Sequence, residues 1–418
     1  MTLKFLWVLY LSVFFLFSPN VFAGNVVVSG FGTVAYSYEN EEDIGFLRDL
    51  SHQSDINDDG QWLSDSRLGL QFDYLMDEDW RFTTQVVAKD NASDRLSDAF
   101  TLGFVAYRPT SDLEIRTGRL GLDAFWATTT RNIDYGHNWV RPPQEVYGWI
   151  AMQALDGVDF LFSIYTPDSE WYLGAQYGAV QSSYASVQGE SISSKGRETL
   201  GLSVKYLTGS WRARAAVLRI GSFDVDVTAE AQQLRTVLNT TSQVGGAVGA
   251  EAEKYSQLMT IEGEEFYYSQ LGLEYFTGKW LLASEFVSIA SESNNPALPS
   301  GIGGYLNISY YWDSWTPYSI LAMFHPDIDA LTPEASWSAF GLDTVQSTAI
   351  SGLNSTRVEQ DTISVGIRWD VMKNIALKAQ ADFISIAENG YGLWVSDTSL
   401  HQSKTSLQLY TLSLNFIF

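Results

Sequence analysis

The chain has 418 residues, of which 45% are hydrophobic and 14% are aromatic, and its formal net charge is −24. This acidic surplus excludes a nucleic-acid partner, which would need a basic face, and the absence of cysteine excludes a disulfide framework and a thiolate metal site. Many aromatic residues at a mean hydropathy of −0.06 are typical of a sheet with one apolar and one wet face.

The first 23 residues have the features of a signal peptide. Lys4 is followed by an apolar segment, residues 5–17, then by Pro19 and by Val21-Phe22-Ala23, a typical cleavage site. A retained anchor is the alternative, but the apolar segment is shorter than the roughly 20 residues that span a bilayer. We expect the mature chain to begin at Gly24. No apolar run beyond it is long enough for a transmembrane helix.

Period-two alternation of apolar and polar residues predicts strands along the rest of the chain. In residues 67–74 every even position is apolar, and residues 363–370 repeat the pattern. The predicted strands are 26–38, 66–75, 79–89, 98–108, 112–120, 155–165, 170–180, 199–207, 210–221, 265–276, 279–290, 303–312, 316–325, 358–370, 374–385 and 405–418. Soluble sandwiches also alternate in this way, so the strands alone do not decide the fold.

The connections between these strands alternate strictly between long loops and turns of a few residues. Short periplasmic turns opposite long extracellular loops are a property of transmembrane β-barrels, in which an even strand number places both termini on one side. We therefore predict an all-β fold, an antiparallel transmembrane barrel of about sixteen strands over residues 24–418. Tryptophans gather beside the short turns and predict an aromatic girdle at that end: Trp80, Trp171, Trp211, Trp280, Trp312 and Trp369.

Two of the long loops have distinct patterns. Residues 55–60 of the first loop match the opening of an EF-hand calcium loop, with Asp55, Asn57 and Asp59 as the candidate ligands. Ser66 stands where a bidentate Glu belongs, so a plain acidic loop is favoured over a Ca²⁺ or Mg²⁺ site. The fifth loop, 222–264, has helical spacing of apolar residues in 230–238 and 251–259. These helices suit an inward gate, an external lid or, more simply, a surface helix pair.

The last strand places Tyr410, Leu412, Leu414, Phe416 and Phe418 on one face, and the chain stops on Phe418. This strand resembles the C-terminal strand by which the barrel-assembly machinery recognises Gram-negative porins. Further porin-like segments are Val28-Ser29-Gly30-Phe31-Gly32, residues 65–71, residues 139–147, Gly157-Val158-Asp159, Trp315-Thr316-Pro317-Tyr318, Val365-Gly366-Ile367-Arg368-Trp369 and Ala376-Leu377-Lys378. The resemblance runs over most of the mature chain and does not identify a subfamily.

The resemblance implies that the third long loop, residues 121–154, folds into the barrel and narrows it. The alternation places several wall arginines inward, facing the charged residues of this loop. The candidate pore-lining residues are Arg67, Arg81, Arg116, Asp123, Arg131, Asp134, Arg141, Glu145, Arg212, Arg214 and Arg368. Acidic groups opposite an arginine cluster would create a transverse field across the constriction. The alternative is that these arginines form structural ion pairs with Glu114, Asp73 or Asp382.

The sequence favours a porin that passes small hydrophilic solutes and ions, in the outer membrane and in contact with lipid and lipopolysaccharide. Acidic outer loops favour cations and an arginine-rich constriction favours anions, so we expect weak cation preference or little selectivity. A structural or adhesive barrel acting through its loops is the alternative. An enzyme is disfavoured because the four histidines lie in or beside loops. A homotrimer is implied by the resemblance, although the short second loop, residues 90–97, puts the expected latch in doubt.

Overall fold

The computed structural model of the chain describes residues 25–53, 56, 60–93, 95–185, 191–396 and 403–418. The predicted signal peptide, residues 1–23, and the candidate cation ligands Asp55, Asn57 and Asp59 lie outside the described residues.

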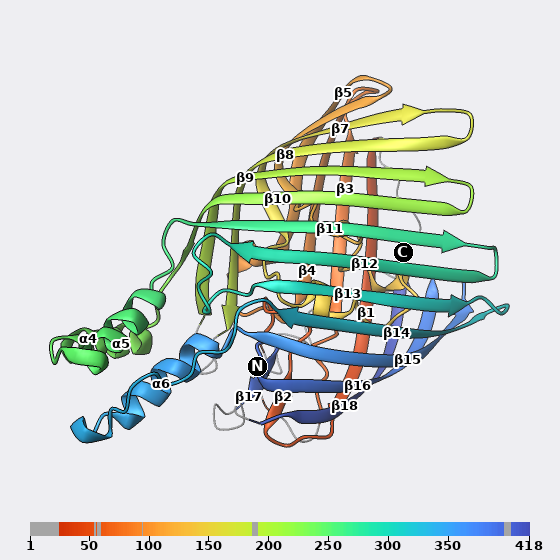
Figure 1. Cartoon of the computed structure of the whole chain (residues 1–418). Coiled ribbons are helices and arrows are strands. Elements are labelled where there is room, and N and C mark those ends of the chain that lie inside the picture. The colour runs from red at the N-terminus through yellow and green to blue at the C-terminus, as the bar shows by residue number, and fades with distance from the viewer. Residues whose placement is uncertain (1–24, 54–55, 57–59, 94, 186–190, 397–402) are drawn as a thin grey trace.

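Sixteen antiparallel strands form a closed barrel, which confirms the predicted fold (Figure 1). The barrel strands are β1 (Val26–Glu39), β3 (Arg67–Leu75), β4 (Trp80–Lys89), β5 (Phe100–Thr110), β6 (Leu113–Gly121), β7 (Ala154–Tyr165), β8 (Ser169–Ala185), β9 (Ser191–Thr208), β10 (Trp211–Val225), β11 (Glu264–Phe276), β12 (Trp280–Ser291), β13 (Gly301–Tyr310), β14 (Trp315–Pro326), β15 (Val358–Met372), β16 (Ile375–Tyr391) and β18 (Thr405–Ile417). A separate two-stranded sheet pairs β2 (Ile44–Phe46) with β17 (Trp394–Ser396).

Alternation along each strand separates an apolar outer face from a polar lumen. In β12, Leu282 and Phe286 are exposed on the outside, whereas Glu285 is fully buried inside. The predicted girdle tryptophans are 36 to 64% exposed and lie at the short-turn end, where Trp315 and Trp369 stack with ring centroids 4.9 Å apart. Indole rings favour such a position at a membrane–water boundary. Among the described residues, no helix is long and apolar enough to cross a membrane.

The two ends of the chain close the barrel. Phe418 and Gly30 exchange two backbone hydrogen bonds, each 2.9 Å long. The rings of Phe418 and Phe416 lie so close to Gly30 and Gly32 that a Cβ atom on either glycine would stand 2.3 or 2.4 Å from ring carbons. The porin-like glycines of the first strand therefore make room for the aromatic residues of the last.

Three helices at the long-loop end form what we call the outer helical module: α4 (Ala229–Ser242), α5 (Gly246–Leu258) and α6 (Asp343–Asn354). They project away from the barrel (Figure 1), so surface helices match the structure and an inward gate does not. The module has its own core, in which Leu238, Tyr255, Trp337, Ala349 and Leu353 are almost fully buried. The short helices are η2 (Ser338–Phe340), in the same loop as α6, and α2 (Leu96–Ala99), η1 (Asp134–Gly136) and α3 (Gln144–Tyr147) in other loops.

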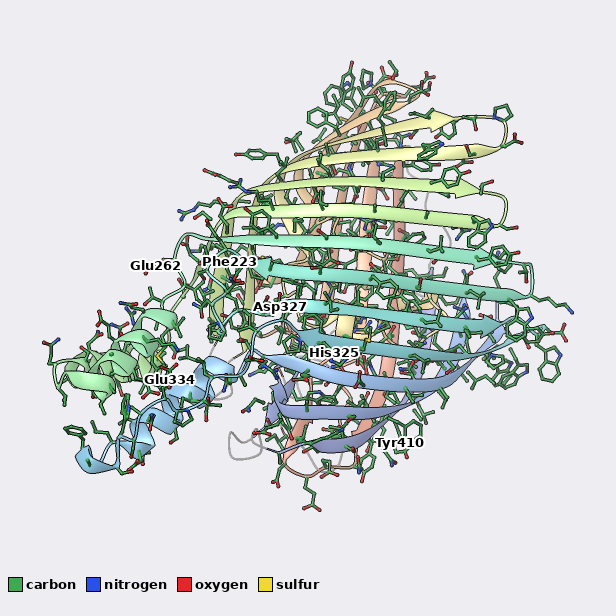
Figure 2. The ribbon with its side chains drawn as sticks, viewed as in Figure 1. Phe223, Glu262, His325, Asp327, Glu334 and Tyr410 are labelled. Atoms are coloured by element: carbon green, nitrogen blue, oxygen red, sulfur yellow. The ribbon has the colours of Figure 1, made fainter. Side chains whose placement is uncertain are left out.

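A single buried carboxylate joins the two loops that build this module. Glu251 of α5 accepts hydrogen bonds from the backbone N–H groups of Glu334 (2.8 Å) and Ala335 (3.1 Å), and from Trp337 Nε1 (2.8 Å) and Gln346 Nε2 (3.1 Å). Burial raises the pKa of this carboxyl, but the hydrogen bonds outweigh burial and hold the pKa below its usual value. Figure 2 shows Glu334 beside the helices, and Tyr410 on the outer face of β18.

Candidate functional site

The long loop between β6 and β7, loop 3, folds into the lumen. A backbone hydrogen bond joins the two ends of loop 3: the Leu122 N–H donates to the Gln153 carbonyl (3.0 Å). Glycines on the facing wall allow its close approach. A Cβ atom on Gly272 of β11 would stand 2.7 Å from the Trp126 ring, and one on Gly303 of β13 would stand 2.8 Å from the Glu145 carbonyl oxygen. These contacts place loop 3 against the inner wall, as expected for the segment 121–154.

A network of three arginines and three aspartates fixes loop 3 to one side of the lumen. We call this network the anchor cluster: Arg48, Asp65, Arg67, Asp134, Arg141 and Asp382. Every side chain in it is at most 5% exposed. The three positive and three negative charges of the cluster offset one another. This balance allows all six ions to be buried together, because an unpaired buried charge costs several kcal/mol.

The anchor cluster connects four parts of the chain. Arg141 of loop 3 lies 2.8 Å from Asp65 of loop 1 and 2.6 Å from Asp382 of β16. Arg48 of loop 1 lies 2.9 Å from Asp65 and 2.6 Å from Asp134. Arg67 of β3 completes the cluster through Asp134, at 3.4 Å. The cluster therefore holds loops 1 and 3 and the barrel wall in one arrangement.

A second set of contacts holds residues 131–137 in the middle of loop 3. Arg131 pairs with Asp49 of loop 1 at 3.3 Å, and His52 Nδ1 lies 3.0 Å from the same carboxylate. Burial lowers the pKa of His52 to about 4, although Asp49 opposes this shift. On the wall, Arg368 Nη1 donates to the carbonyls of Tyr135 (2.6 Å) and His137 (2.9 Å). Loop 3 is thus held through its backbone as well as through its ions.

Lys378 and two glutamates hold the remaining part of the loop. Lys378 Nζ donates to the carbonyls of Asp134 (2.6 Å) and Trp139 (2.8 Å). Glu145 has no ion pair among the described residues and accepts from Gln360 Nε2 (2.7 Å) and from the Thr362 hydroxyl. Burial raises the pKa of Glu145 above its usual value. Glu285 of β12 accepts from the Tyr147 hydroxyl (2.6 Å) and from the backbone N–H of Trp126 (3.0 Å).

The opposite side of the lumen, over β4–β7 and β10–β11, has charged side chains that stay partly accessible. We call these the accessible pairs: Arg81–Glu114, Arg116–Asp159 and Arg212–Glu274. Arg81, Arg116 and Arg212 keep 32, 19 and 59% of their side-chain surface exposed, whereas Asp159 is buried. A solute in the lumen can reach these three arginines, whereas it cannot reach the anchor cluster. Arg214 is fully buried, pairs with Asp123 at 2.9 Å and donates to the carbonyls of Asp123 and Ala124, so it holds the start of loop 3.

The structure thus divides the predicted pore-lining residues into two groups. Arg67, Asp134 and Arg141 belong to the anchor cluster, and Arg131, Glu145 and Arg368 support it. Arg81, Arg116 and Arg212 belong to the accessible pairs, and the buried Arg214 pairs with Asp123 at the start of loop 3. The ion pairing weighed as the alternative is seen with Glu114 and Asp382. The facing arrangement of acidic loop and arginine wall holds for Arg214 with Asp123 and for Arg67 with Asp134.

Several anchoring residues were not among the candidates, and Asp382 was considered only as an ion-pair partner. Arg48 lies in an otherwise acidic loop beside the buried Phe46 and Leu47, and such an isolated cation next to apolar residues is the signal that indicates an inward-folded segment. Asp65 stands within the porin-like segment 65–71 but was given no role. Lys378 lies on the inward face of its strand by alternation. Among the described residues, no group of three His, Cys, Asp or Glu side chains is arranged to hold a metal ion.

Solved structures with the same architecture are porins. OmpF of Salmonella typhi, solved in complex with daunomycin, aligns with a TM-score of 0.53 at 10% identity, over 94% of this chain and 97% of that chain. An anion-selective porin from Comamonas acidovorans aligns with a TM-score of 0.50 at 12% identity, over 94% and 99% of the two chains. No protein-family model matches this chain, and no curated protein matches it. The likeness establishes the porin-type barrel fold.

Proposed function

We propose that this chain is an outer-membrane porin, a passive diffusion channel for small hydrophilic solutes and ions. The observation that carries the proposal is the division of the lumen. The anchor cluster holds the middle of loop 3 against β3 and β16, and the partly exposed Arg81, Arg116 and Arg212 line the wall over β4, β6 and β10. A barrel of sixteen strands is wide enough to leave an aqueous path beside such a loop.

Both signs of charge occur among the accessible side chains. Arg81, Arg116 and Arg212 are interspersed with Glu114 and Glu274. A path with mixed charges favours neither ion strongly, and the acidic outer loops add a weak preference for cations. A reversal potential near zero, or slightly on the cation side, is expected under a KCl gradient.

Planar-bilayer recording of the purified full chain tests the proposal. Stable conductance steps in KCl are expected, and the steps should persist when the salt is exchanged for one with larger ions, with smaller amplitude. A protein that inserts but passes no current across several voltages and salts contradicts the proposal.

Export and assembly follow from the same proposal. Residues 1–23 would direct export, Phe418 would be recognised by the barrel-assembly machinery, and lipopolysaccharide would surround the outer loops. A homotrimer is supported by Arg119 and Asp156, which form an ion pair (2.8 Å) on the outer face of β6 and β7, because charged side chains facing lipid are unfavourable. Light scattering of the detergent-solubilised protein measures the oligomeric state.

The outer helical module favours a second candidate function, an adhesive barrel that acts through its loops. The module has a buried core and lies outside the lumen, where it contributes nothing to a solute path. Replacement of both loops, residues 227–261 and 329–356, by short linkers separates the two functions. If conductance is absent before and after the replacement and cell-surface binding is lost, the adhesive function is favoured; unchanged conductance favours the porin.

A further inference from the structure

Loop 3 reaches wall strands on several sides of the lumen. The Asp123 N–H donates to the Gln176 side chain of β8 (3.0 Å), and the Thr33 hydroxyl of β1 donates to Asp134 (2.9 Å). The contacts described above with β10 to β13, β15 and β16 lie between these two strands around the barrel. Loop 3 therefore extends across the lumen from β8 to β1.

A segment of loop 1, the connection between β1 and β3, joins loop 3 to β4. We call residues 44–52 the loop 1 plug. The Ser51 hydroxyl accepts from Gln153 Nε2 of loop 3 (3.2 Å) and from Lys89 Nζ of β4 (3.0 Å), and the Ser51 carbonyl accepts from the Ala92 N–H (2.8 Å). Ser51 thus connects loop 3 with the wall strand that carries Arg81.

The loop 1 plug has an apolar core inside the barrel. Ile44 and Phe46 are 2% and 0% exposed and pack in one cluster with Trp149 of loop 3 and Phe324 of β14. The Phe46 ring lies 5.9 Å from the Trp394 ring of loop 8. Such packing removes apolar surface from water, so this part of the lumen has the interior of a soluble domain.

Inward polar side chains at the middle of the wall strands are buried on all sides of the barrel. An open lumen would leave such side chains in contact with water. Examples on six strands are Thr33, Gln85, Gln176, Gln270, Ser364 and Thr411. Loops 1, 3 and 8 therefore fill the lumen at this depth, and the partly exposed arginines of the accessible pairs lie on its short-turn side.

The tie between loop 1 and loop 8 is weak compared with the wall. Strands β2 and β17 pair over three residues each, with Ile44 opposite Ser396 and Phe46 opposite Trp394. The neighbouring strands β1 and β18 pair from Phe31 to Glu39. A short two-stranded ladder is marginally stable by itself, and such segments open locally while the rest of a protein stays folded.

We propose that the loop 1 plug is a gate, and that the described conformation is the closed state of the channel. Separation of β2 from β17 and of Ser51 from Lys89 lets the plug move away from β4. This movement uncovers Lys89 and connects the long-loop end with the arginines on the short-turn side. The inference rests on the proposed function and supplies its regulation, since a solute passes only while the plug is displaced.

An engineered disulfide tests the gate in the full chain, which has no cysteine of its own. Ile44→Cys with Ser396→Cys places two thiols at paired positions of the ladder. Paired Cα atoms of antiparallel strands lie about 4.5–5.5 Å apart, within the reach of a disulfide. In planar bilayers the oxidised protein should lose most of its KCl current, and dithiothreitol should restore it.

The control forms the same bond where nothing has to move. Ser288→Cys with Ile302→Cys joins β12 to β13 on the outer face, so the current should be equal in the oxidised and reduced protein. Ser51→Ala acts in the opposite direction. It removes the hydroxyl shared by Lys89 and Gln153 and should raise the mean current. If the 44/396 cysteine pair fails to fold, this variant decides, and an unchanged current then overturns the gate.

Hydrogen exchange reports movement of the plug without any current. Residues 44–52 should exchange faster than the paired parts of β1 and β18, and the 44/396 disulfide should slow them. Exchange as slow as in β1 overturns the gate, and so does an oxidised protein that conducts as well as the reduced one. Fast exchange that the disulfide slows, in a protein that passes no current in any variant, supports the movable plug and overturns the channel instead.

Discussion

On the β16–β18–β1 side of the lumen the arginine–aspartate pairs are enclosed by two loops, whereas over β4, β6 and β10 arginines that pair with carboxylates stay partly accessible. An enclosed ion loses its hydration and depends on its partners, so losing one partner is expensive. An exposed pair is screened by water and contributes about 0–1 kcal/mol. The same chemistry therefore positions a loop on one side and leaves charge available to solutes on the other.

The largest effect is expected from Arg141→Ala. It leaves Asp65 and Asp382 without their shared partner in a buried environment, and breaking such a pair costs about 3–5 kcal/mol. Urea unfolding of the vesicle-inserted protein should show this loss of stability, and loop 3 should move enough to change the conductance. Arg108→Ala is the control, because Arg108 is exposed and pairs only at the rim. Equal losses in the two variants would contradict the division of the lumen.

Gly303→Ala tests the close approach of loop 3 to the wall. The added Cβ would meet the Glu145 carbonyl oxygen at 2.8 Å and the Phe324 ring of β14 at 2.7 Å, and such overpacking costs about 1–3 kcal/mol. Gly103→Ala is the matched control, because nothing lies within 4 Å of a Cβ at that position on β5. The difference in urea midpoint between the two variants measures the effect. A stable Gly303→Ala protein with unchanged conductance would show that loop 3 does not depend on this contact.

The buried His52 predicts a pH dependence of stability. Its folded-state pKa of about 4 lies below the unfolded value, so protonation of His52 favours the unfolded chain. The stabilisation that neutral His52 contributes is fully present above roughly pH 6.5 and is lost as the pH falls toward 4. The loss between pH 7 and pH 5 is about 2 kcal/mol by this linkage. Urea unfolding at the two pH values should show a smaller loss for His52→Gln than for the native chain. His325→Gln, at an exposed position, should keep the native pH dependence, and a His52→Gln protein that also keeps it would refute the assignment.

The smallest effect on stability is expected from Arg81→Gln. Its partner Glu114 keeps Arg108 at 2.5 Å and Arg116 at 3.9 Å, so the free energy of unfolding should change by no more than about 0.5 kcal/mol. Removing an accessible positive charge should instead shift the reversal potential toward cations. Arg197→Gln makes the same charge change at the outer surface and should shift it less. An equal shift would place the selectivity in the outer loops.

The strands were predictable because the apolar–polar alternation of each strand is visible in its own residues. Alternation in residues 67–74 or 363–370 reports two unlike faces without any knowledge of the neighbouring strands. The observed bounds of β1, Val26–Glu39, differ by one residue from the prediction, whereas β9 begins at Ser191, eight residues before its predicted start. Helix α6 was not predicted, because Asp343–Asn354 is rich in serine, threonine and glycine, which are poor helix formers. Its stability comes from Ala349 and Leu353, which pack into the core of the outer helical module.

The partners in the anchor cluster could not be predicted from the sequence. Arg141 is 76 positions from Asp65 and 241 from Asp382, and closure of the barrel together with the folding of two loops brings them together. Alternation shows that Arg67 faces inward, but it cannot show that loop 3 then covers the side chain. Burial of a wall residue by a loop is a tertiary property, and it decides whether a pore-facing charge reaches the solute.

The hydrogen bonds to the Glu251 carboxylate bear on the order in which parts of the chain fold. Its donors Glu334, Trp337 and Gln346 follow it by 83, 86 and 95 positions, and strands β11 to β14 lie between them. Closing a contact across so long a segment is entropically unfavourable until the intervening strands have paired. The hydrogen bonds to Glu251 therefore form late in folding. Trp337 is fully buried in the folded protein. A change in its fluorescence during folding therefore reports when β11 to β14 have paired.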